Sequence, residues 1–484
     1  MELAFIPIYI KFIGIESYGL FGFYLTIKAL LSIFDLGLGL VVNHELARLS
    51  IKSDNEIQMR NILRTFEYIY LGIGFFLGLI LLLSSSIIAN YWFLKSTLSQ
   101  SVIINSIKIM GLIIFMQWPQ SLYTNALLGL QKQLLLNINL IITSTFKSLG
   151  ALIFLNYFNK TISNFLLWQF ISMALISFYF CIVTWYSMPK NFKGSQKFDL
   201  NVIKDNSNFA IGVFFLSFLV AIITQIDKIF LSKFLTLEDF GYYTLASTIG
   251  YGINFIVYPF NITLFPKFTQ FITERKNTEL KILYHKSSYF LSNIIFPITF
   301  IFIFYTQEIL SIWIHDTLTI TKITNLVRFI IIGTLLNSLV TIPYCLQLAN
   351  KWTKLSLYKN IITLFLITPL IFILVKHYGA IGATYVWIIL NIGYILIEIP
   401  FMHKKILINE KYNWYLYDIV LPLSITFIIF LTSTAIDISD FAYLVKYIYL
   451  FVLFTFTFLI IFYLKKVPYF KFFKNNFHDT LPTM

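Results

Sequence analysis

The sequence predicts an all-α, multi-pass membrane protein with two pseudo-symmetric bundles of six helices, two additional C-terminal helices and a shortened first helix. Three observations lead to this fold class: the composition, the recurrence of long apolar segments, and the uneven distribution of basic residues. Hydrophobic residues make up 58% of the chain and charged residues 12%, whereas soluble domains are about one quarter charged. A chain this apolar would expose large hydrophobic surfaces to water unless a bilayer surrounded it.

Apolar segments of membrane-spanning length follow one another along the whole chain. A helix needs about 20 apolar residues to cross about 30 Å of hydrocarbon. Thirteen segments have this character, at residues 19–47, 66–90, 102–127, 134–156, 163–186, 208–231, 241–266, 289–313, 323–348, 355–376, 380–402, 415–435 and 441–464. Residues 1–10 are also apolar, but they rise only about 15 Å as a helix, so we expect them to form the shortened first helix.

The basic residues predict the orientation of these helices. Most of the 36 Lys and Arg residues fall in alternate loops, and loops rich in Lys and Arg stay on the cytoplasmic side of a membrane. Both termini are therefore predicted to be cytoplasmic. The same distribution accounts for the net charge of +14 without the basic soluble face that nucleic-acid binding requires, so we expect a lipid bilayer and no nucleic acid as a partner.

A weak internal repeat divides the chain. At an offset of about 220 residues, Glu16 and Gly19 in the segment 12–21 match Glu238 and Gly241 in the segment 234–243. Two parallel repeats of this kind are typical of transporters in which two bundles rock about a central site. The predicted parts are an N-terminal bundle, a cytoplasmic linker, a C-terminal bundle, and two extra helices with a basic cytoplasmic tail, at residues 1–187, 188–207, 208–410 and 411–484.

Four short segments resemble a known family. They are Ile15-Glu-Ser-Tyr-Gly19, Phe34-Asp-Leu-Gly-Leu-Gly39, Gln225-Ile-Asp-Lys-Ile-Phe230 and Leu237-Glu-Asp-Phe-Gly-Tyr-Tyr243. With them the chain resembles the Wzx-type polysaccharide repeat-unit flippases (oligosaccharide flippases) of the multidrug/oligosaccharidyl-lipid/polysaccharide exporter superfamily, which is MATE-like in fold. The first helix of that family is normally complete, whereas this chain begins within it.

This resemblance implies a fold, a cargo and a location. The fold would be a V-shaped pair of six-helix bundles that opens alternately to each side of the bacterial inner (plasma) membrane. The cargo would be a lipid-linked oligosaccharide, namely an undecaprenyl-diphosphate-linked O-antigen unit of lipopolysaccharide or a capsule unit, moved from the cytoplasmic to the periplasmic or outer face. A polysaccharide polymerase is the candidate protein partner.

Charged residues inside the predicted helices are the candidate site. Lys28, Ser32 and Asp35 follow i, i+4, i+7 spacing and so would share one face of one helix. Because a charge deep in a bilayer costs about 2.5–3.5 kcal/mol on insertion scales, this face should meet a partner or water. In one interpretation Lys28 attracts the diphosphate and Asp35 orients the lysine or couples transport to H⁺ or Na⁺. In the other, they are a buried structural pair.

Lys147 is the preferred single contact with the cargo. It lies near the middle of the predicted helix 134–156, beside Ser144 and Ser148, where its side chain cannot easily reach an interface. We therefore expect it to face a hydrated cavity rather than lipid.

Four further charges were assigned from their positions in the predicted helices. Lys108 and Arg328 lie about 9 Å inside the outer helix ends and are candidate substrate contacts, although their side chains can also extend to the interface. Asp227 and Lys228 are candidate coupling or orienting residues near an outer helix end, with a structural ion pair as the alternative.

Other functions were weighed against transport of a lipid-linked glycan. A cation-coupled multidrug exporter of the same superfamily would favour embedded acids, but embedded lysines outnumber them here. A flippase for a peptidoglycan precursor stays open. A membrane glycan polymerase or ligase would need a large outer loop, and the sequence contains no Asp-x-Asp pair, phosphate-binding loop or His-Glu-x-x-His motif. We therefore expect a transporter without catalytic residues, bound metal or cofactor.

Overall fold

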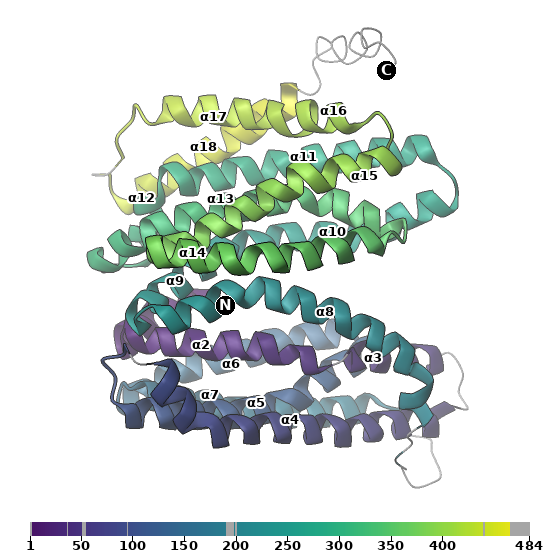
Figure 1. Cartoon of the computed structure of the whole chain (residues 1–484), viewed down its shortest axis with the longest axis vertical. Coiled ribbons are helices and arrows are strands. Elements are labelled where there is room, and N and C mark those ends of the chain that lie inside the picture. The colour runs from purple at the N-terminus through teal and green to yellow at the C-terminus, as the bar shows by residue number, and fades with distance from the viewer. Residues whose placement is uncertain are drawn as a thin grey trace. The chain divides into compact units, whose positions relative to one another are not determined.

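The computed structural model describes residues 2–35, 37–50, 55–93, 95–189, 198, 201–438 and 441–464. Within this part the chain is helical and contains no strand, as the sequence predicts. It divides into two compact units, Met1–Thr244 and Leu245–Met484. In Figure 1 the long helices of each unit run alongside one another.

The first unit holds the helices from the N-terminus to the start of α9. Its elements are α1 (Glu2–Ile13), α2 (Ile15–Leu31), the 3₁₀-helix η1 (Ser32–Asp35), α3 (Leu38–Leu49), α4 (Glu56–Trp92), α5 (Gln100–Gly129), α6 (Gln133–Tyr157), α7 (Ile162–Ser187), α8 (Asn201–Phe234) and α9 (Leu237–Gly250). The helix α1 has 12 residues and covers the segment 1–10 that was predicted to form the first helix.

The second unit begins within α9 and includes two further spans at its C-terminal end. Its elements are η3 (Tyr251–Ile253), α10 (Asn254–Thr273), α11 (Asn277–Phe304), α12 (Thr306–Trp313), α13 (Thr317–Ala349), α14 (Thr353–Gly393), the π-helical turn η4 (Tyr394–Glu398), α15 (Ile399–Lys405), α16 (Lys411–Asn413), the π-helical turn η5 (Trp414–Val420), α17 (Leu421–Ser433) and α18 (Tyr443–Leu464).

Among the described residues, ten helices are long and apolar enough to cross a membrane. They are Ile15–Asp35, Glu56–Trp92, Gln100–Gly129, Gln133–Tyr157, Ile162–Ser187, Asn277–Phe304, Thr317–Ala349, Thr353–Lys405, Lys411–Ser433 and Tyr443–Leu464. The stretch Thr353–Lys405 contains two of the predicted segments, 355–376 and 380–402, and the non-helical backbone of Gly379 (φ +59°, ψ −137°) divides it into two helices, as predicted. The segments 208–231 and 241–266 are helical as α8 and as α9–α10, but neither is among the ten.

The prediction of one unbroken helix over residues 19–47 is wrong. The chain leaves the α-helical conformation after Leu31, forms η1, and starts α3 after Gly37. Gly37 has φ +70°, a left-handed conformation that costs glycine little and other residues more. Lys28 therefore belongs to α2 and Asp35 to η1.

The predicted domain boundaries differ from the two units. Half of the predicted linker 188–207 lies outside the described residues, and its last seven residues, 201–207, belong to α8. The division between the units falls at Thr244 and Leu245. Helix α8, which the sequence analysis assigned to the second bundle, packs against α2 in the first unit.

Small residues bring the helices of the first unit close together. Where α4 crosses α5, a Cβ on Gly78 would lie 2.8 Å from the carbonyl oxygen of Gly111, and a Cβ on Gly111 would lie 2.8 Å from that of Gly78. Such contacts are the usual way for membrane helices to gain packing energy where lipid offers no hydrophobic driving force. They fix α5, which supplies much of the site described next.

Candidate functional site

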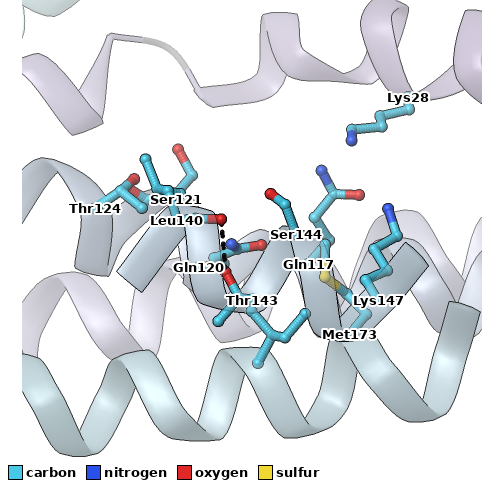
Figure 2. A pocket seen from close by; sticks show the side chains of 11 residues that line it. Lys28, Gln117, Gln120, Ser121, Thr124, Leu140, Thr143, Ser144, Lys147 and Met173 are labelled. Atoms are coloured by element: carbon cyan, nitrogen blue, oxygen red, sulfur yellow. Dashed lines mark hydrogen bonds between the residues drawn. The ribbon is translucent and has the colours of Figure 1, made fainter. Parts of the chain in front are cut away.

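A polar pocket of about 370 Å³ lies inside the first unit. Four helices line it: α2, α5, α6 and α7. The lining residues are Lys28, Gln117, Gln120, Ser121, Thr124, Leu140, Thr143, Ser144, Lys147, Met173 and Ile176 (Figure 2). Most of these side chains are polar, although each comes from an apolar helix, so the pocket provides a hydrophilic environment within membrane-spanning segments.

Lys28 and Lys147 enter this pocket from different helices. Figure 2 shows the two side chains extending toward each other, with the Gln117 amide beside them. Lys28 lies in the last turn of α2, Lys147 lies in the middle of α6, and both are half-buried. Two ammonium groups in one partly desolvated pocket create a positive potential that favours a multiply charged anion over a neutral ligand or a cation.

The turn of α6 that carries Lys147 is held from both sides. The Trp168 indole N–H of α7 donates to the Lys147 carbonyl oxygen at 2.9 Å. The Tyr9 hydroxyl of α1 donates to the Ser148 carbonyl oxygen at 2.9 Å. These bonds fix the backbone, so the position of the Lys147 side chain depends on its own rotamers rather than on motion of the helix.

Gln117 is oriented by the same helix that supplies Lys28. The Tyr24 hydroxyl, one turn before Lys28 on α2, donates to the Gln117 side-chain oxygen at 3.0 Å. With that oxygen engaged, the Gln117 amide nitrogen remains as a donor for an anion or a sugar hydroxyl.

Asp35 does not line this pocket. Its carboxylate accepts hydrogen bonds from the Tyr70 hydroxyl and from the Gly39 backbone N–H, the latter at 3.4 Å. Lys28 lies in the last turn of α2, whereas Asp35 ends the 3₁₀-helix η1, so the two residues do not belong to one continuous α-helix. Asp35 instead ties the start of α3 to α4.

The other predicted site residues lie elsewhere. Lys108 is exposed on α5, and the Arg328 Nε of the second unit donates to the Thr306 hydroxyl at 2.9 Å. The Tyr243 hydroxyl donates to Asp227 at 2.5 Å, and Lys228 donates to the Gln225 side chain at 3.3 Å. None of these four residues lines the pocket that contains Lys28 and Lys147.

The sequence analysis missed the polar face of α5. Gln117, Gln120, Ser121 and Thr124 line the pocket together. Their spacing of i, i+3, i+4, i+7 is that of one helix face, and it occurs within the apolar window 102–127. The sequence therefore contains the signal for this polar face, but a search restricted to charged residues does not detect it.

A second polar cluster lies in the first unit around Glu67. Its carboxylate accepts from Arg64 at 2.8 Å, from the Tyr123 hydroxyl at 3.0 Å and from the Trp185 indole N–H at 2.6 Å. Glu67 is 4% exposed, and a buried charge is tolerated when it is hydrogen-bonded in this way. Since its oxygens already bind these donors, we assign the cluster a structural role joining α4, α5 and α7.

A third cluster joins the helices of the second unit at Glu410. This carboxylate accepts from Lys281, from the His285 Nε2 at 2.9 Å and from the Asn413 amide at 2.7 Å. The His285 Nδ1 lies 2.6 Å from Asp418. Burial by itself would raise the pKa of Glu410, but the hydrogen bonds from His285, Asn413 and Lys281 outweigh it and lower the pKa to about 2.

Groups of three or more His, Cys, Asp or Glu side chains placed to hold a metal ion do not occur in the part of the chain that the structure describes. The polar side chains that line the pocket are amides, hydroxyls and amines, which suit an anion or sugar better than a hard cation.

The fold matches known membrane transporters. A structure titled as the inward-facing conformation of a multidrug resistance MATE family transporter of the MOP superfamily superposes with a TM-score of 0.69 and 13% identity, over 83% of this chain and 94% of that one. A structure of the lipid II flippase MurJ superposes with a TM-score of 0.55 and 16% identity, over 92% of this chain and 96% of that one. The chain thus has the multi-pass helical fold that these membrane transporters share.

The sequence comparison identifies the family. The family model described as "Polysaccharide biosynthesis protein" matches residues 1–272, more than half of the chain, and the chain belongs to that family. A Shigella flexneri protein named "Putative O-antigen transporter" is 24% identical over 383 residues, which cover 78% of this chain and 87% of that protein. The resemblance inferred from the short segments is confirmed at the level of this family.

Proposed function

We propose that this transporter flips an undecaprenyl-diphosphate-linked oligosaccharide, an O-antigen or capsule repeat unit, from the cytoplasmic to the outer face of the bacterial inner membrane by alternating access. The observation that supports this proposal most directly is the pocket with Lys28 and Lys147 facing a row of amides and hydroxyls. Family membership and the named relatives agree with a carrier of lipid-linked sugars.

The chemistry of the cargo explains why such a pocket is needed. A diphosphate loses its hydration when it enters hydrocarbon, at a cost far above the free energy available from a few apolar contacts. Lys28 and Lys147 replace part of that hydration with charge-assisted hydrogen bonds. Gln117, Gln120 and Ser121 supply neutral donors and acceptors of the type that sugar hydroxyls match.

The membrane potential gives this transport a direction. Moving one negative charge out of a negative interior gains about 2.3 kcal/mol per 100 mV. Two charges on the diphosphate would gain about 5 kcal/mol under the same potential. The potential alone can therefore bias export, and coupling to H⁺ or Na⁺ through Asp35 is an addition that the mechanism does not require. A polysaccharide polymerase would consume the exported unit.

A reconstitution assay tests the proposal. The full-length protein in proteoliposomes should move an undecaprenyl-diphosphate-linked oligosaccharide across the bilayer under an imposed potential. The double variant Lys28→Gln, Lys147→Gln should reduce the transport rate by about tenfold or more. Loss of even one charge-assisted hydrogen bond corresponds to a factor of this size. Lys108→Gln is the matched control, because it removes an exposed lysine outside the pocket. Equal transport by the double variant and the control would refute the proposed site.

A further inference from the structure

A long apolar groove runs along the outside of α6, next to the polar pocket. Its volume is about 690 Å³. It is lined by aromatic and aliphatic side chains of α6 and by one indole of α7, including Phe146, Leu149, Ile153, Phe154, Phe158 and Trp168. We propose that this groove binds the isoprenoid chain of the lipid-linked cargo while the diphosphate lies in the polar pocket. The proposal rests on the proposed function.

The floor of the groove is fixed by aromatic packing. The Trp168 ring lies against Gly150, where a Cβ would come within 2.0 Å of the Trp168 Cζ2. The ring centroids of Phe146 and Phe154 are 5.6 and 5.5 Å from that of Trp168. Glycine at position 150 therefore makes room for the indole, and the resulting surface does not depend on a flexible side chain.

The groove and the polar pocket share one turn of α6. Ser144 and Lys147 line the pocket, while Thr145 and Phe146 line the groove. The Trp168 N–H in the groove wall bonds to the Lys147 carbonyl oxygen at 2.9 Å. A ligand that fills both sites must join an anionic group directly to a long apolar chain, which is the chemistry of a polyprenyl diphosphate.

The depth of the junction favours a lipid in transit over a resident phospholipid. Lys147 lies near the middle of α6 (Gln133–Tyr157), whereas phospholipid head groups stay at the bilayer surface. From Phe146 to the end of α6 at Tyr157 the helix rises about 17 Å, more than half of the hydrocarbon thickness of about 30 Å. An extended segment of the chain can thus lie in the groove with its head at mid-membrane depth.

Two exposed isoleucines on α6 give a matched pair of variants. Ile153 lines the groove and is 58% exposed, while Ile141 lines neither cavity and is 59% exposed. Ile153→Trp fills the groove, and Ile141→Trp places the same bulk on the same helix elsewhere. Leu149→Trp is a second groove variant, in case Ile153→Trp impairs folding.

The experiment compares the affinities of the full-length protein in nanodiscs for undecaprenyl diphosphate, farnesyl diphosphate and inorganic diphosphate. We expect the wild-type protein to bind the long chain more tightly than the short one. Ile153→Trp should weaken binding of undecaprenyl diphosphate by about tenfold, because apolar contact with the chain is lost, and should leave inorganic diphosphate binding unchanged. Ile141→Trp should change neither affinity by more than about twofold.

The groove proposal would be overturned if the two tryptophan variants changed the affinity for undecaprenyl diphosphate equally. It would also be overturned if the wild-type protein bound undecaprenyl diphosphate and farnesyl diphosphate with equal affinity. Displacement of undecaprenyl diphosphate by phosphatidylglycerol added at equal concentration would overturn it as well. A failure of the proposed function would differ, since inorganic diphosphate would then bind the wild-type protein and the Lys28→Gln, Lys147→Gln double variant equally.

Discussion

Gly19 of α2 and Gly241 of α9 pack backbone against backbone. A Cβ on Gly19 would lie 2.2 Å from the Leu237 carbonyl oxygen and 3.0 Å from the Gly241 nitrogen. A Cβ on Gly241 would lie 2.3 Å from the Ile15 carbonyl oxygen and 3.2 Å from the Gly19 nitrogen. The contact is therefore reciprocal. The two glycines are also the positions that the internal repeat aligns, and each lies four residues after the start of its helix.

The first prediction concerns this contact. Gly19→Ala and Gly241→Ala should each lower the free energy of unfolding by about 1–3 kcal/mol, since the added methyl group meets backbone that cannot rotate away. Thermal unfolding of the purified protein in detergent measures the change.

Gly72→Ala on α4 is the control, because no atom lies within 4 Å of the position that its Cβ would take. In a helix this substitution should raise stability by about 0.5–1 kcal/mol. If Gly19→Ala and Gly72→Ala had the same effect, close backbone packing at Gly19 would not hold in the protein.

The repeat shows what the sequence could and could not predict. Alignment of Glu16 and Gly19 with Glu238 and Gly241 indicates equivalent positions in two halves, and the structure starts a helix at the same place in both, at Ile15 and Leu237. Equivalent positions in a sequence repeat do not show how far apart the two residues lie in the structure, however. That the two glycines touch follows from the arrangement of α2 and α9, which depends on long-range packing.

The candidate site was predictable to a similar extent. Charges in apolar windows pointed to Lys28 and Lys147 because burial of a lone charge is costly, and both line one pocket. The assumption of a continuous α-helix grouped Asp35 with Lys28, but α2 ends at Leu31, Asp35 belongs to η1, and Asp35 does not line the pocket. Lys108 and Arg328 are basic residues in apolar segments, as Lys28 and Lys147 are, but they do not line the pocket. The sequence does not distinguish them, because the neighbouring helices decide which face of a helix is buried.

The second prediction tests the Glu67 cluster. Glu67→Leu should lower the free energy of unfolding by about 3 kcal/mol or more, because it leaves the buried Tyr123 and the partly buried Trp185 without their shared acceptor and removes the ion pair with Arg64. Trp185→Phe removes one donor and should cost less, about 1–2 kcal/mol. Thermal or denaturant unfolding in detergent provides both values. An effect of Glu67→Leu no larger than that of Trp185→Phe would contradict the central role of the carboxylate.

The third prediction concerns pH. The pKa of Glu410 is about 2 in the folded protein, below its ordinary value of 4.5. A carboxyl with a lowered pKa stabilises the folded state fully above its unfolded pKa, and this stabilisation is lost as the pH falls through the folded pKa. The stability difference between the wild-type protein and Glu410→Gln should therefore be largest above about pH 4.5 and shrink toward about pH 2.

Melting temperatures of both proteins from pH 7 to pH 3 check this expectation. Glu274→Gln is the control: Glu274 also pairs with a lysine, Lys276, at 2.8 Å, but lies at the surface. Because solvent screens such a pair, its removal should have little effect at any pH. A difference for Glu410→Gln that stays constant over this range would show that the ionised carboxylate is not what stabilises the cluster.

The fourth prediction separates the membrane potential from ion coupling. Asp35→Asn retains one side-chain oxygen, which can accept from the Tyr70 hydroxyl, and gives up only the 3.4 Å hydrogen bond from the Gly39 N–H to the other oxygen. It removes the charge and the carboxyl proton. If the potential acting on the diphosphate suffices, the variant should keep voltage-driven transport within about twofold of wild type, whereas collapsing the voltage should slow both proteins.

Flipping in proteoliposomes with an imposed potassium diffusion potential, with and without a transmembrane H⁺ or Na⁺ gradient, distinguishes the two mechanisms. Loss of transport in Asp35→Asn at a normal protein level and normal melting temperature would instead assign Asp35 to obligatory ion coupling. Transport that continues unchanged at zero voltage would exclude the electrical driving force. If the charged diphosphate crosses the membrane potential, the free energy of transport must depend on the voltage.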